Sequence, residues 1–191
     1  MTHETGENDE GDDGHVVVAT ERLVVRPWRH AEADRLLDIL SRVEVARWLG
    51  DGPPRLMRDL DEAHERIDGC GELSATAPLG FWAVVRRDTG RPVGSVLTLE
   101  LPNAEAGEMQ IGWQLHPDSW GQGYAREAAA AVLARALDHG LEEVFALTHV
   151  PNLPSRAVAR AIGMRDLGVH TWWYAEPSQV FRADRTTHPR P

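Results

Sequence analysis

The stretch SWGQGYAREAAAAV, residues 119–132, places two glycines one residue apart, directly before an alanine-rich run. The preceding residues, EMQIGWQLHP at 108–117, have the character of a strand. The run from Arg126 to about His139 has the character of a helix that stops at Gly140. The two glycines therefore occupy a junction between a strand and a helix.

This junction has the properties of an anion site. The first turn of a helix carries N–H groups without intrahelical partners and the positive end of the helix dipole. Gly121 and Gly123 have no Cβ that would hold a ligand away from those groups. We therefore expect the amides of residues 122–126 to cradle a pyrophosphate, with Arg126 adding positive charge. A tight turn without a ligand is the alternative, because two such glycines alone are a weak signal.

A dinucleotide-binding loop of the Rossmann type fits the same stretch poorly. That loop requires a third glycine where Arg126 stands, and an acidic residue after the following strand. Here Glu142 and Glu143 precede that strand, and three strand candidates come before the glycines.

The rest of the chain predicts one mixed sheet. Tight turns between consecutive extended runs predict an antiparallel meander, and a helix that joins two strands predicts that 108–115 and 144–149 are parallel neighbours. Strands are predicted at 15–28, 80–87, 92–101, 108–117, 141–150, 166–175 and 178–183; helices at 31–49, 56–68, 126–139 and 155–163; and a loop at 70–78.

Length and composition predict a single domain. The chain has 191 residues, 42% of them hydrophobic, which suffices for one sizeable core. We expect an acidic disordered tail at 1–15, one domain at 16–183 and a loose tail at 184–191. The polar N-terminus does not resemble a signal peptide, and no apolar run approaches the ~18 residues of a membrane span.

Charge and residue usage narrow the function classes. The net charge is −10 and all 20 basic residues are arginine. The acidic balance argues against nucleic-acid binding and suits solubility or a cationic acceptor, while the lack of lysine excludes Schiff-base and P-loop chemistry. The single cysteine, Cys70, fits a reducing compartment, so we expect a cytoplasmic protein. The nine histidines show no spacing typical of a metal site, and none is expected.

The junction and its flanks resemble the GNAT superfamily of N-acetyltransferases. Its acyl-CoA signature has the form Q/R-x-x-G-x-G/A, and here Trp120, Gly123 and Ala125 take the first, fourth and sixth places. The form W-G-x-G-Y-A is similar to that of the ribosomal-protein alanine acetyltransferase branch. TERLVVRPW at 20–28 and NLPSRAVARAIGM at 152–164 resemble the opening and closing segments of that branch, so the resemblance covers most of residues 18–182.

The resemblance implies a fold and an activity. The fold is α/β (α+β), with a mostly antiparallel sheet of about seven strands, a splayed parallel pair and about four flanking helices. The activity is direct transfer of an acetyl group from acetyl-CoA, without a metal, to a primary amine: a protein N-terminus, a small amine or an antibiotic. A non-catalytic acyl-CoA sensor with the same fold is the alternative. A homodimer is compatible with the sequence, and neither a nucleic-acid nor a membrane partner is expected.

The resemblance also assigns the residues that would bind the co-substrate. In this fold the pantetheine arm pairs with the free edge of the earlier parallel strand, where backbone groups of Trp113 and Leu115 would meet it. Asn152, after the second parallel strand, corresponds to an asparagine that contacts the arm. The pyrophosphate loop would comprise Gly121, Gln122, Gly123, Tyr124, Ala125 and Arg126.

The catalytic residues follow the pattern only in part. Asn152 and Ser155 are assigned beside the reacting thioester, with Ser155 donating to the departing thiolate, although its position alone suggests a helix N-cap. Ala159 stands where many members carry a tyrosine acid, which leaves Ser155, Tyr174 or solvent. Gln110 replaces a common glutamate. We therefore expect Glu108, on the same strand face, to accept the amine proton, with Glu100 and His116 as weaker options.

Overall fold

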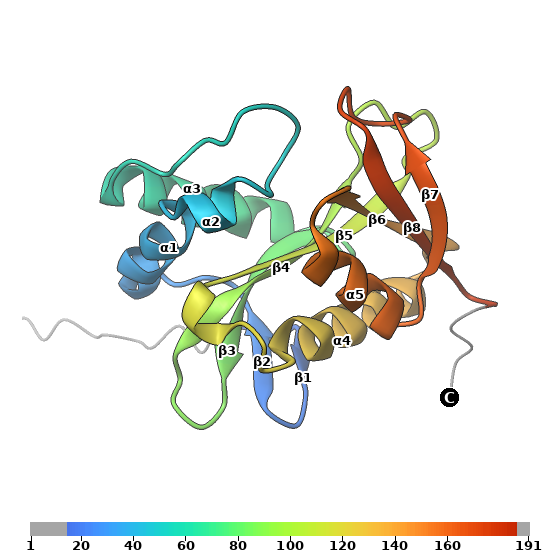
Figure 1. Cartoon of the computed structure of the whole chain (residues 1–191). Helices are drawn as coiled ribbons and strands as arrows, with labels where there is room; N and C mark the ends of the chain where they lie inside the picture. The colour runs from blue at the N-terminus through green and yellow to red at the C-terminus, as the bar shows by residue number, and fades with distance from the viewer. Residues whose placement is uncertain (1–14, 187–191) are drawn as a thin grey trace, which may run out of the picture.

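The computed structural model describes residues 15–186 and centres on one eight-stranded sheet in the order β1-β2-β3-β4-β5-β6-β8-β7 (Figure 1). The strands are β1 (Val18–Ala19), β2 (Leu23–Arg26), β3 (Gly80–Arg86), β4 (Pro92–Glu100), β5 (Met109–Leu115), β6 (Glu143–His149), β7 (Arg165–His170) and β8 (Ser178–Asp184). The α-helices are α1 (Ala33–Leu40), α2 (Val43–Ala46), α3 (Leu60–Ser74), α4 (Tyr124–Asp138) and α5 (Leu153–Ala161), with short 3-10 turns η1 (His30–Glu32) and η2 (Pro117–Ser119).

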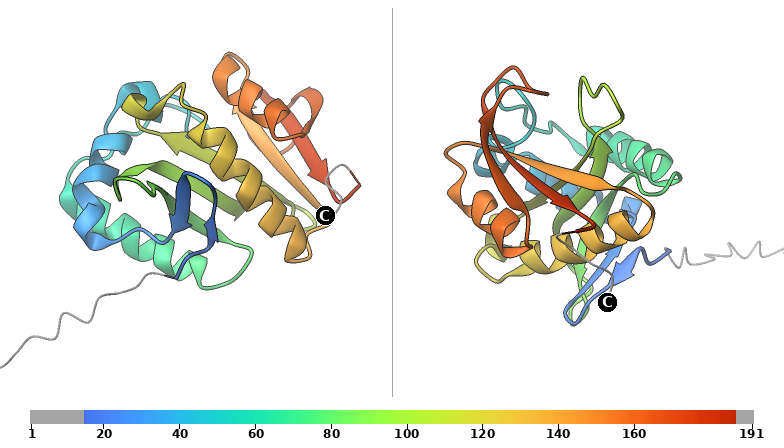
Figure 2. Two further views of the ribbon diagram at one scale, coloured as in Figure 1. Left: turned by 90° about the horizontal axis from the view of Figure 1, so that it is seen from below. Right: turned by 90° about the vertical axis from the view of Figure 1, so that its right-hand side faces the viewer.

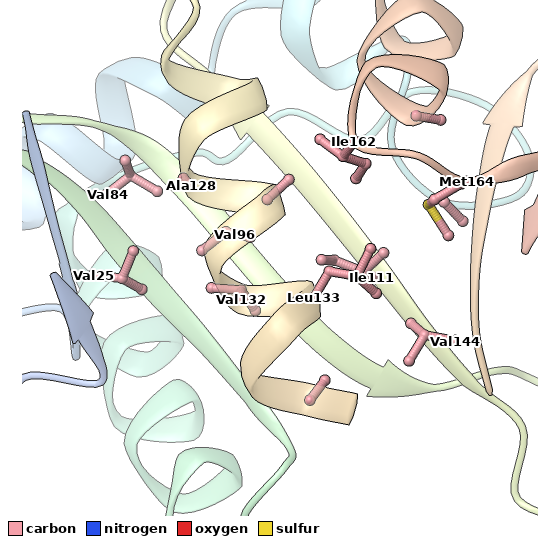
Figure 3. Close-up of a cluster of buried hydrophobic side chains, with 14 of the residues drawn as sticks. Val25, Val84, Val96, Ile111, Ala128, Val132, Leu133, Val144, Ile162 and Met164 are labelled. Carbon is pink, nitrogen blue, oxygen red and sulfur yellow. The ribbon is translucent and has the colours of Figure 1, made fainter. Parts of the chain in front are cut away.

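Helices cover both faces of the sheet. On one face α4 packs its apolar side against alternate residues of the central strands, as Figure 3 shows for Val132 and Leu133, which lie next to Val96 and Ile111. Leu133 is fully buried, which stabilises the fold by roughly 1.5–3 kcal/mol relative to exposure. On the other face α1 and α3 enclose a second cluster that includes Leu36.

The meander of β3, β4 and β5 is antiparallel, as the tight turns predict. Its tightest point is Gly94, where a Cβ would lie 2.2 Å from the carbonyl oxygen of Gln114 and 2.6 Å from the Cα of Leu115. A glycine is therefore required for β4 and β5 to approach one another here.

The parallel pair separates along its length. The α4 crossover makes β5 and β6 parallel, and they are registered only at Gln110 and Phe145. Beyond this pair the strands diverge towards their C-terminal ends, so the two halves of the sheet open away from each other (Figure 2, left). This confirms the predicted fold class, a mostly antiparallel mixed sheet with a splayed parallel pair.

Several expected elements differ from the structure, and two of the differences change the counts. The segment 15–28 forms two short strands around a turn, so the sheet has eight strands rather than about seven. The predicted helix 31–49 divides after Leu40, giving five α-helices within residues 15–186 rather than about four. The segment 166–175 forms a strand only to His170.

The predicted loop at 70–78 is wrong over its first residues. Helix α3 begins at Leu60, where Asp59 caps it by accepting from the backbone nitrogen of Glu62, and it continues through Cys70. Ile67 and Cys70 lie one turn apart and are both buried. Their burial outweighs the low helix propensity of the two glycines that flank Cys70.

The chain ends were predicted as tails. The acidic tail lies outside the described residues, apart from His15. At the other end Asp184 is the last residue of β8, and Arg185 donates to the carbonyl oxygens of Leu137 and Leu141. Within residues 15–186 no helix is long and apolar enough to cross a membrane.

Candidate active site

The glycine loop leaves the start of α4 open. Gly121 and Gly123 have φ angles of +72° and +80°, a left-handed conformation that favours glycine. Gly123 is the N-cap of α4 and provides no side-chain cap, whereas α3 and α5 are capped by Asp59 and Asn152. The N-cap of α4 therefore offers no side-chain partner to the first amides of the helix, and the anion site stays a prediction.

Two residues that the sequence analysis missed hold this loop in place. The Arg22 guanidinium donates to the carbonyl oxygen of Gln122 at 3.0 Å and forms an ion pair of 2.6 Å with Glu127 in the first turn of α4. Glu127 also accepts from the Thr20 hydroxyl at 2.5 Å. Burial raises the pKa of Glu127, but these hydrogen bonds outweigh burial and leave the pKa below its usual value. The turn between β1 and β2 is thereby fixed to the loop.

The backbone edge of β5 faces the opening between the parallel strands. The carbonyl oxygen of Glu108 and the backbone nitrogen of His116 both bond to the β4 side. Backbone direction alternates along a strand, so the intervening odd residues Trp113 and Leu115 point towards the gap. The indole of Trp120 donates to the Leu115 carbonyl oxygen at 2.8 Å. The Leu115 N–H and both backbone groups of Trp113 therefore remain to pair with a molecule bound in the gap.

Asn152 and Ser155 stand at the start of α5. The Asn152 side-chain oxygen accepts from the Ser155 backbone nitrogen at 3.2 Å. Asn152 is therefore the N-cap, and the alternative that Ser155 occupies this position is wrong. Ala159 is fully buried.

One cavity of about 1080 Å³ joins these features. It extends from the α4 loop, with Gly121, Gly123, Tyr124, Ala125 and Arg126, past Trp113, Leu115, Asn152 and Ser155 to the region between β5 and α3. The structure thus brings together the predicted residues of the co-substrate site, except Gln122, which is exposed beside the cavity.

Two residues that line the same cavity each carry a buried polar atom with no hydrogen-bond partner among residues 15–186: Oγ1 of Thr148 and Nε2 of Gln114. Thr148 shares the α4 face of β6 with Val144 and Ala146. Buried polar groups normally have partners, so these atoms mark positions where a bound molecule is expected. Strand alternation predicts which face they occupy, but the sequence carries no signal that they lack partners.

The structure does not bring Glu108 to the cavity. Its carboxylate accepts from the backbone nitrogen of Ala106 at 3.1 Å, and this hydrogen bond lowers its pKa. Glu100 and His116 also lie outside the cavity lining. Gln110 and Tyr174 do line the cavity, and Nε2 of Gln110 lies 3.5 Å from the hydroxyl of Tyr174.

The loop after α2, with Gly50, Asp51 and Pro53, lines the end of the cavity opposite the α4 loop and is called the roof below. Asp51 accepts from the backbone nitrogens of Ala175 and Glu176, at 2.7 Å and 3.1 Å. His149 at the end of β6 donates from Nε2 to the Gly50 carbonyl oxygen at 3.2 Å. Because a carbonyl only accepts, this contact leaves Nδ1 of a neutral imidazole with its lone pair. Sequence reasoning assigned no role to Asp51 or His149.

Comparison with known proteins identifies the family. A model described as the acetyltransferase (GNAT) domain matches residues 22–165, and the chain belongs to this family. It is 24% identical over 155 residues to the uncharacterized N-acetyltransferase p20 of Bacillus licheniformis, covering 78% of this chain and 83% of that protein. It is 28% identical over 152 residues to the FsC-acetyl coenzyme A-N(2)-transacetylase of Aspergillus fumigatus, covering 76% and 63%.

The fold is shared with solved structures. Mycobacterium smegmatis RimJ in complex with CoA-disulfide superimposes with a TM-score of 0.73 at 17% identity, covering 88% of this chain and 84% of that one. The GNAT resemblance and its fold are thereby confirmed. Among residues 15–186 no group of three His, Cys, Asp or Glu side chains is arranged to hold a metal ion.

Proposed function

We propose that this protein is an N-acetyltransferase that transfers an acetyl group from acetyl-CoA directly to a primary amine within a ternary complex. The observation that carries the proposal is the shared cavity, which joins the uncapped start of α4 to the open edge of β5. The first suits a pyrophosphate, and the second suits an extended chain that pairs with a strand.

The described residues fit acetyl-CoA. The left-handed glycines leave room over the first amides of α4, and Arg126 adds a positive charge at the cavity wall. The backbone groups of Trp113 face the gap, and the unpartnered Thr148 hydroxyl lies on the α4 face. When bound, acetyl-CoA supplies a thioester carbonyl that an amine can attack.

The chain supplies fixed hydrogen-bond donors for the transfer. An N–H of Trp113 that points into the gap stabilises negative charge developing on an oxygen, an effect typically worth ~3 kcal/mol. Ser155, with its backbone fixed by Asn152, places a hydroxyl at the start of α5, where it can donate to a departing sulfur. We assign the amine proton to Nδ1 of His149 rather than to Glu108, because His149 lines the cavity and Glu108 does not.

Release of CoA thiol from acetyl-CoA tests the proposal, measured with the full chain against alkylamines, amino-acid amides, short peptides and aminoglycosides. We expect thiol release that depends on both protein and amine, with equimolar N-acetylated product by mass spectrometry. Acetyl-CoA binding with no transfer to any amine would point instead to a sensor. If acetyl-CoA does not bind, both the acetyltransferase and the sensor hypotheses are wrong.

A further inference from the structure

Gln114 lines the cavity and carries a buried hydrogen-bond donor. Its side chain is 7% exposed, and its Nε2 has no partner among residues 15–186. A buried donor without a partner is costly, and in an apolar environment a hydrogen bond that completes it is stronger than in water. The amide of Gln114 therefore favours a ligand that offers an oxygen.

This donor faces the acceptor half of the cavity. The neighbouring residues Trp113 and Leu115 pack towards α4, with the predicted co-substrate. Side chains alternate along a strand, so Gln114 shares the opposite face with Gly112 and Gln110. Gly112 on that face lies against Leu97, which packs with the cluster under α1 and α3. A molecule that meets Gln114 is therefore expected to be the amine.

The lining on the Gln114 side of β5 is apolar in part, and it also includes charged side chains of α3 and of the loop before it (Arg55, Arg58, Glu62, Glu65 and Arg66). The cavity lining on this side includes Leu40, Val45, Met57 and Leu97. Val45 and Met57 are 4% and 7% exposed, and both pack within the cluster under α1 and α3. The combination of this apolar part of the lining with the Gln114 donor favours a molecule that carries an apolar group and an accepting oxygen.

We infer, as an extension of the proposed function, that Gln114 is a specificity-determining residue which donates a hydrogen bond to an oxygen of the acceptor. The acceptor class is a primary amine that carries both an apolar side chain and a carbonyl oxygen. An amine with the same apolar chain and no oxygen leaves the Gln114 donor unpaired and is a poorer substrate.

Two matched amines test this inference. Leucinamide carries an isobutyl group and a carbonyl, and 3-methylbutylamine is the same molecule without the carboxamide. Thiol release is measured for both with the full chain, and kcat/KM is expressed per concentration of unprotonated amine. We compare the wild type with Gln114→Met, which keeps the chain length without polar atoms, and with Gln114→Glu, which replaces the donor by an acceptor.

We expect both substitutions to lower kcat/KM for leucinamide by about tenfold or more, and Gln114→Met to change it for 3-methylbutylamine by less than about twofold. Equal losses for both amines, or no loss for either, would overturn the inference while leaving acetyl transfer intact. A wild type that prefers 3-methylbutylamine would also overturn it. A wild type that acetylates no amine would refute the proposed function and this inference with it.

Thermal unfolding of the free protein gives a readout that needs no activity. Because Nε2 of Gln114 has no partner among residues 15–186, Gln114→Met should leave the melting temperature unchanged or raise it. The control is Thr98→Val on β4, which removes a buried hydroxyl that donates to the Pro78 carbonyl oxygen at 2.6 Å and should lower it. If Gln114→Met lowers the melting temperature as much as Thr98→Val, the donor has a partner within the protein and the inference is wrong.

Discussion

Asp51 accepts a hydrogen bond from the backbone nitrogen of Ala175 at 2.7 Å, although 124 residues separate the two along the chain. The other carboxylate oxygen accepts from the next backbone nitrogen, that of Glu176. The pair ties the loop after α2 to the loop between β7 and β8, across the region where β5 and β6 diverge (Figure 1). The two loops on either side of the cavity are thus joined through Asp51.

Replacing Asp51 should loosen this roof. In Asp51→Asn the side chain retains one accepting oxygen, so one of the two N–H groups loses its partner. We expect hydrogen exchange at Ala175 and Glu176 to accelerate by about tenfold, and KM for the amine to rise while acetyl-CoA affinity stays unchanged. Asp61→Asn, an exposed change in α3 outside the cavity, is the control. Unchanged exchange in Asp51→Asn would show that the contact does not hold the roof.

Alanine substitutions at Gly123 and Gly107 distinguish the effect of backbone strain on stability from an effect on acetyl-CoA binding. Both have positive φ, +80° at Gly123 and +74° at Gly107, and only Gly123 lines the cavity. Alanine at either position should cost about 1 kcal/mol of unfolding free energy. Calorimetric titration should show acetyl-CoA affinity falling about tenfold in Gly123→Ala only. Equal affinities in both variants would mean that the loop does not approach the co-substrate.

Glu127 predicts how stability depends on pH. Its pKa is lower in the folded protein than in the unfolded chain, so its stabilising effect is complete above about 4.3, the unfolded value, and is lost as the pH falls through the folded value. We expect Glu127→Gln to lower the urea-unfolding free energy by about 2 kcal/mol at pH 6. The difference between variant and wild type should shrink below pH 4. A difference that stays constant with pH would show that the Glu127 charge makes no contribution.

Gly94 predicts a steric cost. Because its Cβ would collide with the backbone of Gln114 and Leu115, Gly94→Ala should destabilise the fold by about 3 kcal/mol in urea unfolding. A Cβ at Gly71 on α3 would meet no described atom within 4 Å beyond its chain neighbours and the adjacent helix backbone, so Gly71→Ala should stabilise by about 0.5–1 kcal/mol. Equal effects at the two glycines would contradict the close approach of β4 and β5.

Local patterns in the sequence predict much of this fold. The meander, the crossover and the glycine loop depend on turns and on neighbouring residues, and all are found. The predicted boundaries are wrong where contacts between distant segments determine the local structure. Cys70 is helical because its side chain is buried against the sheet. The tight junction of β4 and β5 at Gly94 likewise depends on two strands meeting.

The site was predictable where a motif marks it and less so elsewhere. The α4 loop, Trp113 and Asn152 lie together as expected. Glu108 was placed by strand alternation alone, which fixes the side of a strand but not how far a residue lies along the cavity. No local pattern predicts the roles of Asp51, Thr148 and Gln114. Asp51 binds backbone groups of a distant loop, and the polar atoms of Thr148 and Gln114 find no partner among residues 15–186.

Hydrogen exchange with and without acetyl-CoA shows, residue by residue, whether the α4 loop and the β5 edge bind the co-substrate together. We expect acetyl-CoA to slow exchange at the backbone amides of residues 124–126 and at Trp113 and Leu115, and ADP to slow it at 124–126 alone. If saturating acetyl-CoA protects neither group of amides, the cavity is not the acetyl-CoA site.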